Sequence, residues 1–303
     1  MLSDYYINKL NAKERGALND LLCGISKKKP KIALSSALTQ RIIETVLYSY
    51  PELYFVDFAD ISSTSSVVGI TARITYLDYD ESAIKKHAET ILAGIKKGST
   101  ETVVRQLHNY FVKNIKYDEE NPKKTESHNI VGVLKDGKGV CEGIAKAFQY
   151  LLNRLNIDNA IVTGECDGEP HMWNVVNIEG RNYHIDVTTD ISLSEPFWNK
   201  PGYFCYLLTD IEIKKTHSFK EHFECNSHKD NPFYKANRVF SDNKEIISYL
   251  KTLRRDESII YFNYKGKMDA DEVSKTVSLY WKKGWMTGGV FMKCFLNTYY
   301  YWI

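Results

Sequence analysis

The stretch Gly139-Val140-Cys141-Glu142-Gly143-Ile144-Ala145-Lys146-Ala147-Phe148 places one cysteine where a glycine-bearing turn gives way to a helix. Apolar residues recur at helical spacing, at Ile144, Ala145, Phe148, Leu151, Leu152 and Leu155. Cys141 should therefore lie in the first turn of an amphipathic helix, where unpaired N–H groups and the helix dipole favour a thiolate. Because the thiolate is the nucleophilic form of cysteine, the pattern indicates a nucleophile at Cys141.

Two segments further along the chain offer a base and a carboxylate to this thiol. The first is His171-Met172-Trp173-Asn174-Val175-Val176, and the second is Tyr183-His184-Ile185-Asp186-Val187-Thr188. Both alternate and are rich in β-branched and aromatic residues, and Glu179-Gly180 lies between them. This arrangement predicts a β-hairpin.

The hairpin determines which side chains share a face of the sheet. With Glu179 and Gly180 as the loop, Trp173 faces Asp186 and His171 faces Thr188, all on one face. His171 and Asp186 are then diagonal neighbours with Cα atoms roughly 7–8 Å apart, a span that an imidazole and a carboxylate can bridge. Asp186 would fix the imidazole tautomer while the other ring nitrogen takes the thiol proton.

Taken singly, each of these residues has a simpler structural explanation. A lone cysteine on a helix is usually a small buried hydrophobe. A strand histidine is commonly a satisfied structural residue, and an aspartate such as Asp186 commonly caps a turn or helix. The order of the three segments and their flanking residues favours the catalytic interpretation.

The motifs in chain order are Gly-Val-Cys-Glu-Gly, His-x-Trp-Asn and Tyr-His-x-Asp-x-Thr. This order resembles the core of the transglutaminase-like superfamily, in a bacterial-type member, and the resemblance is best over residues 99–210. It implies an α+β, papain-like fold in which the helix bearing Cys141 packs on an antiparallel sheet bearing His171 and Asp186. It also implies a thiol enzyme that needs no cofactor and no metal.

The resemblance implies acyl transfer on a peptide or carboxamide through a thioester on Cys141, with His171 shuttling the proton. The backbone N–H of Cys141 and one further donor would hold the oxyanion, and Trp173 and Tyr117 are candidates for that donor. We expect hydrolysis rather than crosslinking. The alternatives are a protein transglutaminase or deamidase, and a non-catalytic peptide-binding module that retains the triad.

Composition agrees with a globular enzyme of about two domains, since 43% of the 303 residues are hydrophobic. Lys+Arg 40 against Asp+Glu 38 leaves a net charge of +2, which indicates no nucleic-acid partner and no anionic membrane. The expected partner is a protein or peptide substrate, and the oligomeric state is not indicated. No basic-then-apolar leader and no membrane-spanning stretch is visible, so the expected location is the cytoplasm, or outside the cell if a leader was removed.

The six cysteines are scattered without a Cys-x-x-Cys pair, which favours reduced thiols. A second candidate site combines His217, His222, Cys225 and His228 in one short segment, a set that could close a structural zinc site. The spacing matches no standard zinc finger, so we expect no metal there. Cys166 lacks a helix end to activate it and is interpreted as incidental.

The layout predicts three parts, at residues 1–98, 99–230 and 231–303. In the first part we expect two helices joined by Lys27–Lys31 up to about residue 50, strands at 51–56 and 67–76, a loop at 62–66 and a helix at 81–97. In the second we expect a helix at 101–115 and a first strand at 160–164. In the third we expect helices at 245–253 and 269–282 and strands at 259–264 and 290–301. This order mirrors residues 53–97 and suggests that both ends of the chain share one sheet.

Overall fold

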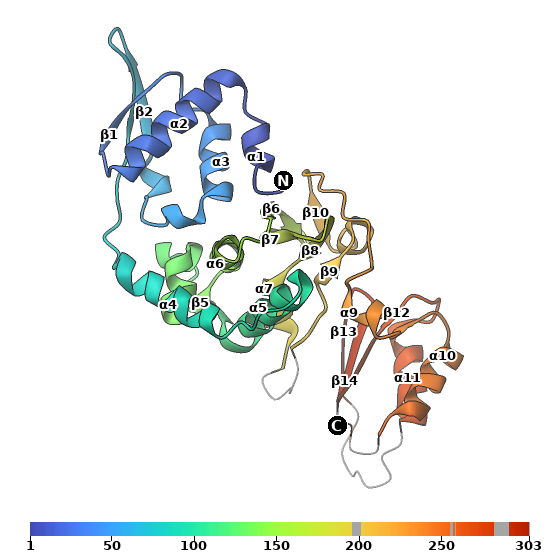
Figure 1. Ribbon diagram of the computed structural model, residues 1–303. Helices are drawn as coiled ribbons and strands as arrows, with labels where there is room; N and C mark the ends of the chain where they lie inside the picture. Colours follow the sequence, from blue (N-terminus) through green and yellow to red (C-terminus); the bar gives the residue numbers. More distant parts are fainter. Residues whose placement is uncertain (196–200, 255–256, 258, 282–290, 303) are drawn as a thin grey trace.

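The computed structural model describes residues 1–195, 201–254, 257, 259–281 and 291–302. Helices and strands are segregated into an α+β arrangement (Figure 1). At the centre is a five-stranded antiparallel sheet with the order β10-β6-β7-β8-β9. Its strands are β6 (Asn159–Cys166), β7 (Glu169–Ile178), β8 (Arg181–Ile185), β9 (Tyr206–Leu208) and β10 (His217–Phe219).

Helix α6 (Cys141–Arg154) packs against β7 and begins at the cysteine of the opening motif. Its apolar face is buried, as the periodicity predicts, and includes Ile144, Phe148 and Leu151. The first turn is crossed by the segment η3 (Thr125–His128), whose Ser127 carbonyl would lie 2.3 Å from a Cβ at position 143. Gly143 is therefore required by the close approach of this backbone to the helix.

Helix α5 (Thr100–Asn114) covers α6, as the sequence predicts, with Phe111 edge-on to Phe148 at 5.3 Å between ring centroids. Two short strands, β4 (Lys116–Tyr117) and β5 (Lys138–Gly139), pair in parallel just before α6. They are separated by η3 and by one turn of π-helix, η4 (Gly132–Asp136). This pairing holds Tyr117 opposite Gly139, two residues before Cys141.

The predicted hairpin of β7 and β8 is confirmed with its register, since Ile178 pairs with Arg181 around the Glu179-Gly180 loop. One part of that prediction is wrong. The ladder ends at Ile185, and Asp186 is the N-cap of helix α7 (Val187–Leu193), so Thr188 is helical and does not face His171 across the strands. The Asp186 side chain accepts a hydrogen bond from the Thr189 N–H, which starts the helix.

The N-terminal part contains four helices and its own three-stranded sheet, β1-β3-β2. The elements are α1 (Tyr5–Asn8), α2 (Ala12–Ser26), β1 (Lys31–Leu34), α3 (Gln40–Ser49), β2 (Ser62–Ser66), β3 (Gly69–Arg73) and α4 (Glu81–Ala93). The predicted strand at 51–56 is wrong, because Pro51–Leu53 forms the 3₁₀ turn η1, followed by a second turn η2 (Phe58–Asp60). The predicted loop at 62–66 is strand β2, and β1 is a strand that the sequence did not reveal.

The C-terminal part has a separate four-stranded sheet with the order β11-β12-β14-β13. Its elements are β11 (Val239–Phe240), α10 (Asn243–Thr252), β12 (Ile259–Tyr264), α11 (Ala270–Tyr280), β13 (Phe291–Phe295) and β14 (Thr298–Trp302). The expectation of one sheet shared by both ends of the chain is wrong, because each sheet closes its own apolar cluster. The predicted single strand at 290–301 is a hairpin of β13 and β14. Residue 282, the end of the predicted helix at 269–282, and residue 290, the start of the predicted strand, lie outside the described residues.

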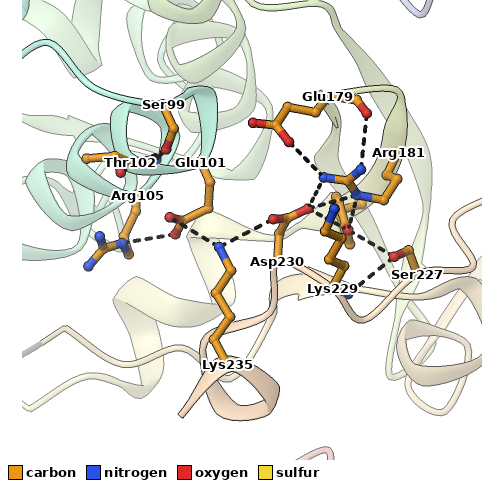
Figure 2. A network of polar contacts seen from close by, with 11 residues as sticks. Ser99, Glu101, Thr102, Arg105, Glu179, Arg181, Ser227, Lys229, Asp230 and Lys235 are labelled. Atoms are coloured by element: carbon orange, nitrogen blue, oxygen red, sulfur yellow. Dashed lines mark hydrogen bonds and ion pairs between the residues drawn. The ribbon is translucent and has the colours of Figure 1, made fainter.

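Between β9 and β11 the chain forms α8 (Asp210–Ile213), β10 and α9 (Pro232–Lys235). Figure 2 shows how this connector is fastened to the rest of the structure. The Asp230 carboxylate accepts from the Arg181 guanidinium at 2.8 Å and lies 3.3 Å from the Lys235 ammonium, which also approaches Glu101 of α5 at 3.6 Å. The network fastens the end of this connector to β8 and α5, while β10 is held by its pairing with β6. Within the part of the chain described here, no helix combines the length and apolarity needed to cross a membrane.

Candidate active site

Cys141 is the first residue of α6, after Val140 as N-cap. Helix geometry leaves its backbone N–H without an intrahelical partner, so this group can donate to a ligand. The side chain is half-buried and near enough to His171 to help raise the pKa of that imidazole. The helix end and the imidazole are the two features that stabilise a thiolate.

Asp186 is fully buried and its carboxylate collects several hydrogen bonds. His171 Nε2 donates to Oδ2 at 2.9 Å, and His217 Nε2 donates to the same oxygen at 3.1 Å. The Thr189 N–H donates to Oδ1 at 3.0 Å, and the Thr189 hydroxyl donates to Oδ2. Because a carboxylate only accepts, both imidazoles carry their proton on Nε2 toward Asp186. For His171 this leaves Nδ1 for the thiol.

Asp186 and the two histidines beside it shift one another's pKa values. Burial alone would raise the pKa of Asp186, but the adjacent His171 and His217 hold the pKa of this carboxyl well below its usual range. Burial alone would lower the pKa of His171, but the charge and hydrogen bond of Asp186, with a smaller contribution from Cys141, raise it to about 10. Burial alone would also lower the pKa of His217, but Asp186 and Cys166 raise it. The site therefore favours a carboxylate beside an imidazolium.

Helix α7 holds Asp186 in place from behind. Its Asp190 is fully buried and accepts a hydrogen bond from His108 Nε2 of α5 at 2.8 Å, while the Cys205 N–H donates to the other oxygen at 2.9 Å. The Asp186 N–H in turn donates to the Cys205 carbonyl at 2.9 Å. These contacts fix the first turn of α7 and so the direction of the Asp186 side chain.

Trp173 lies next to His171 on β7, but its indole N–H does not point to the thiol. It donates to His184 Nδ1 at 3.0 Å, and His184 Nε2 donates to Asp210 at 2.8 Å. The ring is 1% exposed and stacks on His171 with 5.9 Å between centroids and 22° between planes. The proposal of Trp173 as an oxyanion donor is therefore corrected, since its one donor is already used. The ring instead sets the plane of the imidazole.

Tyr117 remains the side-chain candidate for the oxyanion donor. It is 37% exposed, and burial, with a further contribution from the neighbouring Cys141, raises the pKa of its hydroxyl. The parallel pairing of β4 with β5 brings the ring to the cysteine end of α6. A protonated phenol at this place can donate to an oxygen that becomes negatively charged on the substrate.

The structure does not assemble the zinc set considered above. His217 hydrogen-bonds Asp186, whereas the backbone N–H of Cys225 donates to Asp210 at a separate place in the fold. His228 stacks on Tyr234 at 4.2 Å, and no cation-ligating group formed by the described residues combines these four side chains. His184 fits a metal poorly as well. Its Nδ1 accepts the Trp173 N–H, so the histidine proton is on Nε2, the atom that faces Asp210 and Cys225. A protonated ring nitrogen has no lone pair for a metal.

His217 is the site residue that the sequence did not identify. It lies on β10, pairs with Cys166 of β6 and is 3% exposed, with its edge against Trp173 at 4.8 Å between centroids. Nothing local marks it, because its partner Asp186 is 31 positions earlier in the chain. The segment around it, Lys215-Thr216-His217-Ser218-Phe219-Lys220, is mostly polar, so a buried histidine does not stand out there.

Comparison with known proteins identifies a family over part of the chain. The sequence profile of the Transglutaminase-like superfamily matches residues 85–187. Residues 85–187 form a transglutaminase-like domain. That range contains Cys141, His171 and Asp186, while His217 lies beyond it. No curated protein matches the chain.

Several solved structures are similar to part of the chain. One is described as a TGase, with 16% identity, a TM-score of 0.33 and coverage of 55% of this chain and 52% of its own. A candidate cysteine protease from Cytophaga hutchinsonii has 13% identity, a TM-score of 0.31 and coverage of 43% and 61%. Menin, in a structure that shows its binding site for Mixed Lineage Leukemia protein, has 14% identity, a TM-score of 0.31 and coverage of 59% and 38%. The chain thus spans 38% to 61% of the length of these three proteins.

Proposed function

We propose that the protein is a thiol-dependent acyl-transfer enzyme that acts on peptide or carboxamide substrates through Cys141, His171 and Asp186. One observation carries the proposal: a single imidazole, His171, hydrogen-bonds a buried carboxylate at 2.9 Å, and Cys141 at a helix N-terminus is among the groups that raise the pKa of that imidazole. A nucleophile, a base and an orienting group in this order is the arrangement that activates a thiol. The transglutaminase-like domain at residues 85–187 supports thiol chemistry at the level of the superfamily.

The proposed reaction begins when Cys141 Sγ, as the thiolate, adds to the carbonyl carbon of the substrate. The oxygen becomes negative and is held by the Cys141 N–H and the Tyr117 hydroxyl. When the C–N bond breaks, His171 gives its Nδ1 proton to the departing amine, and a thioester remains on Cys141. Water or a second amine then attacks the thioester, gives a proton back to His171 and releases the thiolate.

The role proposed for Asp186 is to keep the imidazole in the productive state. Its carboxylate accepts Nε2–H, so Nδ1 stays directed at the thiol in both protonation states of His171. The raised pKa of His171 keeps the imidazole protonated at neutral pH. The stacked Trp173 ring keeps the plane of the imidazole constant during the proton transfer.

We further propose that the acyl acceptor is water. A transamidating enzyme must exclude water from the thioester, which needs a covered approach. Here Tyr117, near the thiol, is 37% exposed and Cys141 is half-buried, so the cysteine end of α6 borders solvent. This accessibility favours hydrolysis of a peptide or carboxamide over crosslinking.

The choice between products is tested by competition. A glutamine peptide is supplied with a labelled primary amine at millimolar concentration, and incorporated amine is compared with released ammonia and cleaved peptide. We expect hydrolysis products to dominate. Dominant amine incorporation would reverse the preference, and neither product from a broad peptide library would favour a non-catalytic peptide-binding module.

His217 is expected to act as a positioning residue for Asp186. Replacing it with alanine removes one donor from the buried carboxylate, so we expect kcat to fall roughly tenfold to a hundredfold while KM changes little. His217→Gln keeps an N–H donor at a similar reach and should recover part of the loss. Steady-state kinetics with melting curves checks this, and equal losses in both variants, or a change confined to KM, would contradict it.

A further inference from the structure

A cavity of about 270 Å³ lies between the N-terminal part and the start of α6. On one side its wall consists of the end of α3 and the turns η1 and η2, including Leu53, Tyr54 and Phe58. On the other side are Ile130 and the first turns of α6. The residues from η1 and η2 lie outside the transglutaminase-like domain at 85–187, so the N-terminal part contributes half of this site.

The size and the walls of the cavity suit a large apolar group. A cavity of about 150 Å³ lined by aliphatic and aromatic residues holds benzene, so the present space is sufficient for an aromatic or branched side chain. Removing such a group from water is favourable by roughly 1.5–3 kcal/mol. The walls are fixed by the fold, because Tyr54 and Val56 are buried parts of the two neighbouring cores.

One end of the cavity is charged. Lys146 has a side chain 10% exposed, and its ammonium lies 2.5 Å from Glu142 Oε1. The other Glu142 oxygen accepts from His128 Nδ1 at 2.8 Å. An ammonium has three hydrogens, and Glu142 is the one partner that the described residues give it. Lys146 can therefore donate to an oxygen on a molecule in the cavity.

The cavity and the thiol share the first turn of α6. Glu142 lines the cavity and directly follows Cys141, so their Cα atoms are about 3.8 Å apart. An extended peptide advances roughly 3.3–3.6 Å per residue. On this spacing, a substrate whose scissile carbonyl is held at Cys141 would reach the cavity with a side chain a few residues away.

We infer that this cavity is a specificity pocket of the proposed acyl transfer, and that it takes a large apolar side chain of the peptide substrate. The backbone carbonyl of the same residue would accept from Lys146. The inference rests on the proposed function, and it assigns to the N-terminal part the selection of substrates for a thiol that residues 85–187 provide. The substrate class is thus peptides with an aromatic or branched aliphatic residue close to the scissile amide.

The test measures binding apart from catalysis. The full chain carrying Cys141→Ala is titrated with N-acetyl-L-phenylalaninamide and with N-acetyl-L-alaninamide, by calorimetry or ligand-observed NMR. We expect the phenylalanine compound to bind at least about tenfold more tightly. In the same background, Ala59→Trp places a ring at the exposed rim of the cavity and should remove the difference. Ala12→Trp, an equally exposed alanine on α2, is the matched control and should leave it intact.

The charged end is tested by Lys146→Met, which keeps the length of the side chain and removes its donors. We expect weaker binding of both amides, with the preference for phenylalanine retained. Equal affinity for the two compounds, or a preference that survives Ala59→Trp in a folded protein, would overturn the inference. If the preference is present and blocked by Ala59→Trp while the unmodified protein turns over no amide, the pocket stands and the proposed catalysis fails.

Discussion

Cys141→Ala is expected to abolish turnover of peptides and carboxamides while the protein stays folded. In the proposed reaction the Cys141 thiol supplies the atom that carries the acyl group. Losing the nucleophile of a triad costs on the order of 10⁶ in kcat in a comparable hydrolase. The fold should tolerate the change because the side chain is half-buried and loses a single sulfur.

The measurement is product release by the variant and by the unmodified protein, with thermal melting recorded for both. Cys23→Ala is the matched control, because Cys23 is an exposed thiol on α2 and its removal should leave the rate unchanged. Full activity in the Cys141 variant would refute the proposed nucleophile. Loss of activity in both variants, with normal melting, would show that activity does not depend on the Cys141 thiol alone.

Asp186→Asn is expected to lower kcat by on the order of 10³–10⁴ with little effect on folding. Asparagine caps a helix as well as aspartate does, so α7 should still begin at this position. The new amide can donate to His171 Nε2, which moves the imidazole proton to Nδ1, where it opposes thiol deprotonation. The variant also removes the negative charge that raises the pKa of His171.

The pH dependence separates these effects. In the unmodified protein the pKa of His171 is raised, so the imidazolium is present at neutral pH and is lost as pH rises through about 10. Without the Asp186 charge, burial lowers the pKa of His171, so the imidazolium is lost at lower pH. We expect the alkaline limb of kcat/KM to move to lower pH in Asp186→Asn, measured from pH 5 to 11. An unchanged limb would show that Asp186 does not control His171.

The centre of the site was predictable from sequence because its signals are local. The register of β7 and β8 follows from the alternation of their residues and from Glu179-Gly180, whose positive φ values suit a tight turn. The helix start at Cys141 follows from the glycine-bearing turn before it and from the apolar periodicity that begins at Ile144. The end of β8 was misplaced because Val187 and Thr188 are β-branched and resemble strand residues, whereas capping by Asp186 turns the chain into a helix.

The parts that sequence did not predict depend on distant partners. Ser62–Ser66 has the composition of a loop, yet it forms a strand because β3 offers an unpaired edge. Lys31–Leu34 continues a lysine-rich segment, so its sequence did not indicate a strand. It pairs with the other edge of β3. The contact of His217 with Asp186 depends on the pairing of β10 with β6. The Trp173 N–H donates to His184 because this residue offers a buried acceptor. Tertiary pairing overrides local preference at each of these positions.

Alkylation of Cys141 tests the central claim most directly. The protein is exposed briefly to iodoacetamide at pH 6, and each modified cysteine is quantified by peptide mapping, with the exposed Cys23 as internal standard. An ordinary thiol is almost entirely protonated at this pH, whereas a thiolate paired with the His171 imidazolium reacts. We predict that Cys141 is modified far faster than Cys23 and that His171→Ala removes the excess. Equal rates at Cys141 and Cys23 in the unmodified protein would contradict the account.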